Sequence, residues 1–217
     1  MPEKLKRIAV VGGANLDIGG FPAGTLMEKD SNPGRVRMSA GGVGRNIAEN
    51  IVRMGMRVDL ITSIGGDANG RILLEDCRAK NISTKNALFF EDANTSVYLF
   101  IDDAQGDMHC AINDMEIQLR LTPQCLMEKL DLLNGMNAVV LDANLPAETI
   151  TCLMENLKVP VFADTVSVAK AGKLRTSLDK IYCLKPNSME AEMLTGVQIR
   201  DAMDAMEASR RDRKSVV

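Results

Sequence analysis

Gly41-Gly42-Val43-Gly44-Arg45-Asn46 is the stretch from which the fold can be deduced. It leads directly into a helix-like run, and it follows an apolar, strand-like run at 8–11. That first run ends in Gly12-Gly13-Ala14-Asn15-Leu16-Asp17, so two short polar side chains come at the end of a buried strand. Short acceptors of this kind fix the hydroxyls of small molecules, while glycine lets a ligand approach the backbone. We therefore expect Asn15, Asp17 and the glycine turn to form a small-molecule site.

The glycine cluster also has other interpretations. Gly42-x-Gly44-x-x-Ile47 is one residue short of the dinucleotide fingerprint and does not follow the first strand directly, which argues against an NAD-binding domain. No Gly-x4-Gly-Lys-Ser/Thr phosphate loop occurs in the sequence. A glycine turn before a helix is common turn chemistry as well. The polar pair upstream and the motifs downstream favour a binding site here.

Four dispersed segments resemble the ribokinase-like (PfkB) family of sugar and nucleoside kinases, and their order and spacing match those of the family. They are VVGGANLDIGG (10–20), AGGVGRNIAENIVRMG (40–55), ITSIGGDANGRIL (61–73) and LKPNSMEAEMLTG (184–196). Within the family, segments 30–50, 94–115 and 159–175 are most similar to the pseudouridine kinases. The resemblance predicts an ATP-dependent kinase that phosphorylates a hydroxyl of a sugar or nucleoside.

The resemblance implies an α/β fold with a ribokinase-like, Rossmann-type three-layer core, a mostly parallel sheet and a small β-sheet lid. The residue pattern agrees with this fold, because short apolar runs alternate with helical patterns. The strand-like runs are 8–11, 58–64, 138–142, 159–163 and 181–184, and the helical patterns are 44–54, 69–80, 123–134, 147–157 and 187–195.

Two segments, about 16–40 and 95–113, interrupt this alternation. The second reads as two strands joined by a turn at 103–106. The resemblance implies that both segments form the lid, which in relatives often serves as a homodimer interface. We expect one domain over residues 1–208 and an unstructured tail over residues 209–217.

The resemblance also implies roles for individual residues. Asn15 and Asp17 would bind substrate hydroxyls, and Gly41, Gly42 and Asn46 would form the floor of the sugar site. Two further substrate contacts would come from the ends of buried strands, namely Asn144 and Asp164. For Asp164, a turn-forming or helix-capping role fits the sequence equally well.

Asn187 and Glu190 have two interpretations. Their spacing at a helix start is that of a capping box, which needs no function. The resemblance instead implies the Asn-x-x-Glu motif of the family, in which Glu190 would hold Mg²⁺ through water near the ATP phosphates. ATP and Mg²⁺ are therefore the implied cofactors, and the resemblance allows a monovalent cation too.

Relatives carry a later Gly-Ala-Gly-Asp motif, which forms an anion hole and supplies the catalytic base. This motif does not occur in the 217 residues, and the resemblance ends at about residue 208. We therefore assign no catalytic residue in this chain and expect a C-terminally incomplete fold. We interpret the chain as the N-terminal part of a kinase, and we expect this part to be inactive by itself. The alternative is a non-catalytic sugar- or nucleoside-binding remnant, or an inactive truncated product.

Composition limits the partners and the compartment. The formal net charge of −3 favours neither a nucleic acid polymer nor an anionic membrane. The first apolar run is too short for a signal peptide, and no run is long enough to span a membrane. Five scattered cysteines suggest neither a disulfide framework nor a zinc site, and the single histidine, His109, has no cysteine or carboxylate pair at ligand spacing. We expect a cytoplasmic protein.

Overall fold

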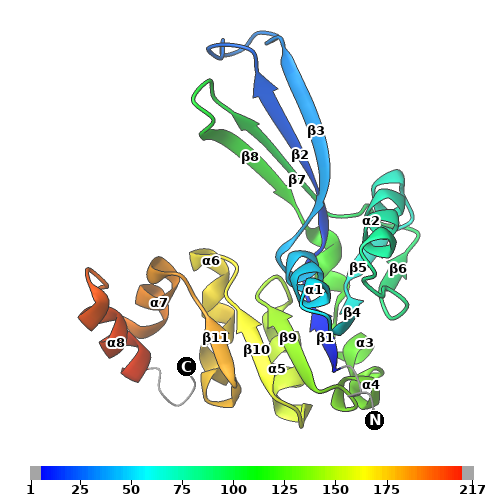
Figure 1. The fold of residues 1–217 in the computed structure, drawn as a ribbon, viewed down its shortest axis with the longest axis vertical. Coiled ribbons are helices and arrows are strands. Elements are labelled where there is room, and N and C mark those ends of the chain that lie inside the picture. Colours follow the sequence, from blue (N-terminus) through cyan, green and yellow to red (C-terminus); the bar gives the residue numbers. More distant parts are fainter. Residues whose placement is uncertain (1–5, 212–217) are drawn as a thin grey trace.

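The computed structural model describes residues 6–211, which form a layered α/β core with a separate sheet projecting from it (Figure 1). The strands are β1 (Arg7–Val11), β2 (Asn15–Pro22), β3 (Gly34–Gly41), β4 (Arg57–Ile61), β5 (Ser63–Gly65), β6 (Leu88–Phe90), β7 (Val97–Asp102), β8 (Met108–Asp114), β9 (Ala138–Asp142), β10 (Val161–Asp164) and β11 (Cys183–Lys185). The α-helices are α1 (Val43–Arg53), α2 (Ala68–Ala79), α3 (Pro123–Met127), α4 (Leu130–Asn134), α5 (Ala147–Asn156), α6 (Val168–Ala171), α7 (Ser188–Thr195) and α8 (Ala202–Arg211), and two 3₁₀ helices cover Glu116–Arg120 and Gly172–Lys180.

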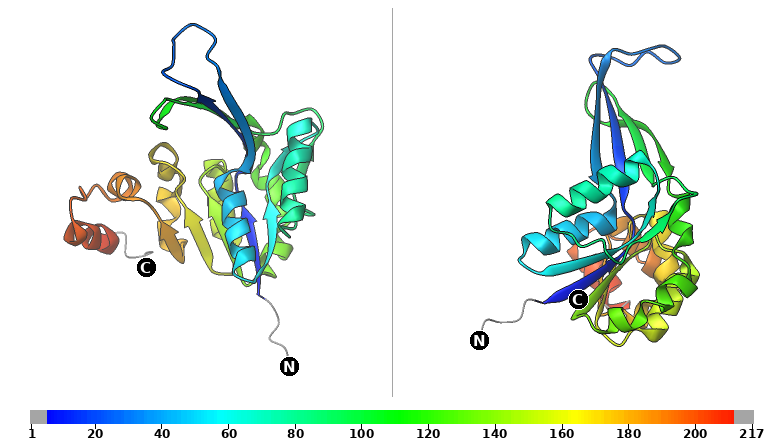
Figure 2. Two further views of the ribbon diagram at one scale, coloured as in Figure 1. Left: turned by 45° about the horizontal axis from the view of Figure 1, so that its top comes forward. Right: turned by 90° about the vertical axis from the view of Figure 1, so that its right-hand side faces the viewer.

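The main sheet has the strand order β11-β10-β9-β1-β4, and all of its neighbouring strands are parallel. β1 lies inside the sheet, with Val10 between Leu60 of β4 and Val140 of β9. Successive β1 residues point to opposite faces, so Val10 packs in the core under α1 and α2, and Val11 packs in the core under α3 and α5. Helices cover both faces of the sheet (Figure 2), which confirms the predicted three-layer α/β architecture.

The projecting sheet is the lid, with strand order β3-β2-β7-β8 (Figures 1 and 2). β2 pairs antiparallel with β3 and parallel with β7, and β7 pairs antiparallel with β8. The register gives the lid two different faces. Ile18, Leu99 and Ile112 are aligned on the apolar outer face, whereas Asp17 is aligned with Tyr98 on the inner face.

Three expected elements differ in the structure. The run at 58–64 divides into β4 and β5, because Thr62 belongs to neither strand and β5 pairs with β6 instead of extending the main sheet. The pattern at 123–134 divides into α3 and α4. Residues 209–211, expected in an unstructured tail, belong to α8, because Ala, Met and Arg favour helix and Ala208 is buried. The rest of the expected tail lies outside the described residues.

Across residues 6–211, no helix combines the length and apolar character needed to cross a membrane.

Candidate functional site

Gly12 and Gly13 follow β1 and contact the buried carboxylate of Asp142. Asp142, at the end of β9, accepts hydrogen bonds from the backbone N–H of Gly13 at 2.8 Å and of Asn144 at 2.9 Å. A Cβ at Gly12 would overlap the Asp142 carboxylate, and a Cβ at Gly13 would overlap the Asn144 amide. Burial raises the pKa of Asp142, although the two N–H groups act in the opposite direction. The glycines thus bring the ends of β1 and β9 together.

Asn15 and Asp17 begin the lid strand β2 and are joined to each other. The Asn15 amide donates a hydrogen bond to Oδ1 of Asp17 at 2.5 Å. Gly41 lies opposite Asn15 in β3, and a Cβ there would overlap the Asp17 carboxylate. Burial raises the pKa of Asp17, while the Asn15 hydrogen bond and the nearby Arg45 charge lower it. Gly41 therefore makes the space in which this carboxylate lies.

Gly42 precedes α1 and allows the helix to approach the β1–β2 connection. Its φ is 94°, and a Cβ there would come within 2.6 Å of both Ala14 Cα and the Gly13 oxygen. The backbone N–H of Arg45 bonds to the same Gly13 oxygen at 3.1 Å. Only glycine combines this backbone conformation with such a close approach.

Arg45, the residue before Asn46, lies on the buried face of α1 and was not identified from the sequence. Its guanidinium donates to Oδ1 of Asn46 at 2.9 Å and pairs with Glu49 and with Asp76 of α2. Because Arg45 occupies the oxygen of the Asn46 amide, Asn46 would meet a ligand through the donor Nδ2. A charged residue on the buried face of an otherwise amphipathic helix was the available sequence signal.

These residues surround a pocket of about 230 Å³ between the core and the lid. It is lined by Asn15, Asp17, Gly42, Val43, Asn46, Tyr98, Asn113, Met115, Asn144, Val166 and Lys170. The structure thus brings together five of the seven predicted substrate residues, and Gly41 shapes the same place from behind Asp17. The lid contributes Tyr98 and Asn113 from its inner face.

Lys170 of α6 lines the pocket and was not identified from the sequence. Its ammonium group donates to Oδ1 of Asn144 at 2.6 Å and lies 3.8 Å from the sulfur of Met115. Burial lowers the pKa of Lys170, and the Asp142 charge partly offsets this. Because α6 is only four residues long, no periodic pattern in the sequence identified it.

Asp164 is not among the residues that line this pocket. Its Oδ1 accepts from the backbone N–H of Val166 at 2.8 Å, and its Oδ2 is 3.4 Å from the Lys185 ammonium group. The structure therefore shows the turn-forming interaction that was the alternative for this residue.

Asn187 and Glu190 form the capping box of α7. The Asn187 side chain accepts from the Glu190 N–H at 2.9 Å, and Oε2 of Glu190 accepts from the Asn187 N–H at 2.8 Å. The same Oε2 also accepts a hydrogen bond from the Thr165 hydroxyl at 2.5 Å. Within residues 6–211, no group of three or more His, Cys, Asp or Glu side chains could hold a metal directly. Mg²⁺ usually keeps several waters, so a contact through water requires only the Glu190 carboxylate.

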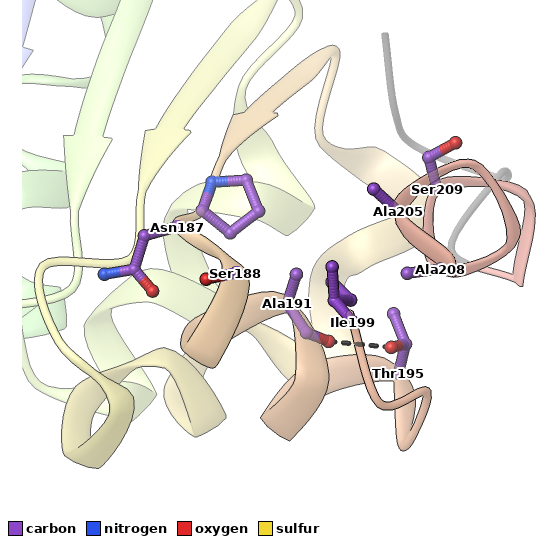
Figure 3. A pocket seen from close by; sticks show the side chains of 9 residues that line it. Asn187, Ser188, Ala191, Thr195, Ile199, Ala205, Ala208 and Ser209 are labelled. Atoms are coloured by element: carbon purple, nitrogen blue, oxygen red, sulfur yellow. Dashed lines mark hydrogen bonds between the residues drawn. The ribbon is translucent and has the colours of Figure 1, made fainter. Parts of the chain in front are cut away.

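A second pocket, of about 270 Å³, separates α7 from α8 (Figure 3). Its α8 side is formed by Ala205, Ala208 and Ser209, and the Asn187 amide is directed away from them. Its lining includes the hydroxyls of Ser188, Thr195 and Ser209, but none of the described residues that line it is charged, so we assign it no binding role.

The sequence matches the model of the pfkB family of carbohydrate kinases over residues 5–217, and the chain belongs to that family. Over 198 residues, which make up 91% of the chain, it is 36% identical to the pseudouridine kinase of Escherichia coli strain K12. A solved structure of a carbohydrate kinase from Agrobacterium tumefaciens has a TM-score of 0.86 and 32% identity, covering 97% of this chain and 67% of that one. The structure of ribokinase from Arabidopsis thaliana, solved with ribose and ATP, has a TM-score of 0.83 at 20% identity. The match covers 98% of this chain and 70% of that one, and it shows that the two share a fold.

The chain spans 63% of the length of the E. coli pseudouridine kinase. Family membership therefore holds for the matched residues, 5–217.

Proposed function

We propose that this protein provides the substrate-binding part of an ATP-dependent kinase that phosphorylates a hydroxyl of a sugar or nucleoside, with pseudouridine as its preferred substrate. The observation that carries the proposal is the pocket in which Asn15, Asp17 and Asn46 meet beneath the lid. Its volume of about 230 Å³ lies below the roughly 300–1,000 Å³ of drug-sized ligand sites, which suits a sugar or a small nucleoside.

The lining residues divide the recognition of such a substrate between them. Asp17 accepts hydrogen bonds from two sugar hydroxyls, and charge-assisted bonds of this kind are the strong ones. Asn15 orients the Asp17 carboxylate, Asn46 donates through Nδ2, and Gly41 and Gly42 leave room for the sugar. On another wall, Asn144 and Lys170 offer a polar pair to the substituent of the sugar.

ATP and Mg²⁺ would lie toward Asn187 and Glu190, at the start of α7. Glu190 would act through water, because its carboxylate already caps the helix and binds Thr165. When bound, Mg²⁺ neutralises the charge of the transferring phosphate. Asn187 and Glu190 hold the start of α7 in place, which orients its first N–H groups.

Binding without turnover is the second candidate function of the 217-residue chain. The pocket is formed within the described residues, yet the Gly-Ala-Gly-Asp motif that supplies the base in relatives is not in the sequence. A general base contributes about 10²–10⁴-fold in rate. Calorimetry with pseudouridine, ribose and ATP, together with an ADP-release assay, tests both functions. We expect binding of pseudouridine and little binding of ATP; no affinity for either pseudouridine or ribose would refute the substrate-site proposal.

The outer face of the lid supports a homodimer. Val36 is 72% exposed, Met38 52% and Ile112 68%, and Leu99 lies between Ile18 and Ile112 in the register. An exposed apolar sheet face of this kind is stabilised when a second copy covers it.

The five free cysteines suit a reducing compartment, so we place the protein in the cytoplasm.

A further inference from the structure

A strained turn follows β10 and forms part of the pocket wall. Val166 has a φ of 64°, in the left-handed region. For a β-branched residue this conformation is a genuine outlier. The backbone N–H of Ser167 bonds to the Thr165 oxygen at 2.7 Å, which closes the turn around Val166. Three-residue turns with a positive φ at the centre are rare and strained.

Neighbouring groups hold this turn on both sides. Oδ1 of Asp164 accepts from the Val166 N–H at 2.8 Å. The fully buried Thr165 donates its hydroxyl to Oε2 of Glu190 at 2.5 Å, which ties the turn to α7. Strained residues persist only where the surrounding structure fixes them, and they are concentrated at functional sites.

The turn lies across the pocket from the residues that would bind hydroxyls. Asn15 and Asp17 follow β1, whereas Val166 follows β10, and β9 lies between these strands. Neighbouring strands are about 4.8 Å apart, so the ends of β1 and β10 are separated by roughly 10 Å. A ribose ring held by Asn15 and Asp17 occupies the near side, which leaves the far side for the group attached to the ring.

Valine gives this position something that the usual turn residues do not. Glycine adopts a positive φ without strain, and asparagine does so more readily than valine. The valine side chain is stiff and apolar, and here it both lines the pocket and packs against the core. The strain is therefore accompanied by a rigid apolar surface in the pocket.

We propose that Val166 is a specificity-determining residue, whose side chain contacts the planar ring attached to the ribose of a nucleoside. Asp164 is the positioning residue that holds Val166 in place, and it acts through the Val166 N–H instead of touching the ligand. This inference rests on the proposed function, since it assumes that the pocket binds a nucleoside.

The first test compares Val166→Gly with Val168→Gly as a matched control. Val168 carries the same side chain two residues further on, is 38% exposed and does not line the pocket. Calorimetry with pseudouridine and with ribose gives a ratio of dissociation constants for each variant. Removing apolar contacts from a pocket costs about tenfold or more in discrimination. We expect Val166→Gly to weaken pseudouridine binding by that factor and leave ribose binding unchanged, whereas Val168→Gly changes neither.

Thermal melting accompanies this comparison, because Val166→Gly relieves the strain and should not lower the melting temperature. Val166→Ala, which keeps a Cβ, serves as a second variant if the glycine variant folds poorly. An unchanged ratio of pseudouridine to ribose affinity in Val166→Gly would overturn the inference while leaving the proposed function intact. A wild-type chain that binds neither compound would remove both.

The second test compares Asp164→Ala with Asp164→Asn. The asparagine oxygen can still accept from the Val166 N–H, whereas alanine cannot. We expect Asp164→Ala to lose discrimination as Val166→Gly does, and Asp164→Asn to retain it. If the affinity for pseudouridine falls equally in both variants, the Asp164 charge contacts the ligand directly and the positioning role is refuted.

Discussion

Gly41→Ala is the most direct test of the hydroxyl-binding pair. The new Cβ would overlap the Asp17 carboxylate. Gly41 is not among the described residues with positive φ, so alanine can adopt its backbone conformation. Since the obstacle is the end of a side chain, the carboxylate can swing aside while the two lid strands stay paired. The substitution thus removes the predicted acceptor without removing Asp17.

The expected loss follows from the hydrogen bonds that the displaced carboxylate can no longer make. Hydrogen bonds to a charged group contribute about 1.5–3 kcal/mol each, so two of them amount to about 3–6 kcal/mol. At about 1.4 kcal/mol per factor of ten, affinity for pseudouridine should fall by roughly two to four orders of magnitude. Stability should change little, because replacing glycine with alanine gains only about 0.4–1 kcal/mol through the unfolded chain.

Calorimetry measures the affinity, and Gly20→Ala in the same lid strand pair is the matched control. A Cβ at Gly20 would lie 3.5 Å from Cγ1 of Ile101, which is an ordinary contact. We expect Gly20→Ala to bind as the wild type does, and both variants to melt within a few degrees of it. If Gly41→Ala binds pseudouridine as tightly as the wild type, the position of the Asp17 carboxylate is irrelevant and the reasoning fails.

The remaining predictions concern pH, the glycine floor, assembly and catalysis. Because burial raises the pKa of Asp17 above its ordinary 3.8, ligand affinity should fall on acidification at a higher pH than an exposed aspartate would give; a calorimetric profile that is flat into the acid range would contradict this. Asp142→Asn should lower the free energy of unfolding by about 1–3 kcal/mol, since one amide oxygen cannot serve the N–H groups of both Gly13 and Asn144; urea unfolding with an unchanged midpoint would disprove it. Ile112→Glu on the outer lid face should convert a dimer to a monomer in sedimentation, and no change would argue against that interface. The purified chain should release no ADP above background with pseudouridine, ribose, fructose or adenosine, and sustained turnover would require a base that is not identified here.

Much of the fold followed from local patterns. Apolar runs such as 138–142 form parallel strands of the main sheet, as expected, because a strand that is buried on both faces reads as a continuous apolar run. The turn at 103–106 predicted the two strands that it joins, β7 and β8, whereas the lid itself was implied by the family resemblance. The division of 58–64 into two strands was missed, because it depends on the distant strand β6, which local periodicity does not reveal.

Part of the candidate site was predictable from the sequence. The glycine turn and the polar residues after β1 resemble the motifs of the family, so Asn15, Asp17 and Asn46 were predicted as substrate contacts. All three line the pocket, as does the predicted Asn144. Lys170 and Arg45 could not, because one lies on a four-residue helix and the other depends on an ion pair with Asp76 of α2. Both act through tertiary contacts, which leave little trace in a single sequence.

The strand order has a consequence for biosynthesis. Val10 of β1 meets Leu60 of β4 fifty residues later, but its neighbour on the other edge, Val140, comes a hundred and thirty residues later. At a synthesis rate of about 5–20 residues per second, Val140 is added roughly 6 to 26 seconds after Val10, and until then this edge of β1 is unpaired. Asp17 is therefore synthesised well before Lys170, and the residues that line the pocket are all present only late in synthesis.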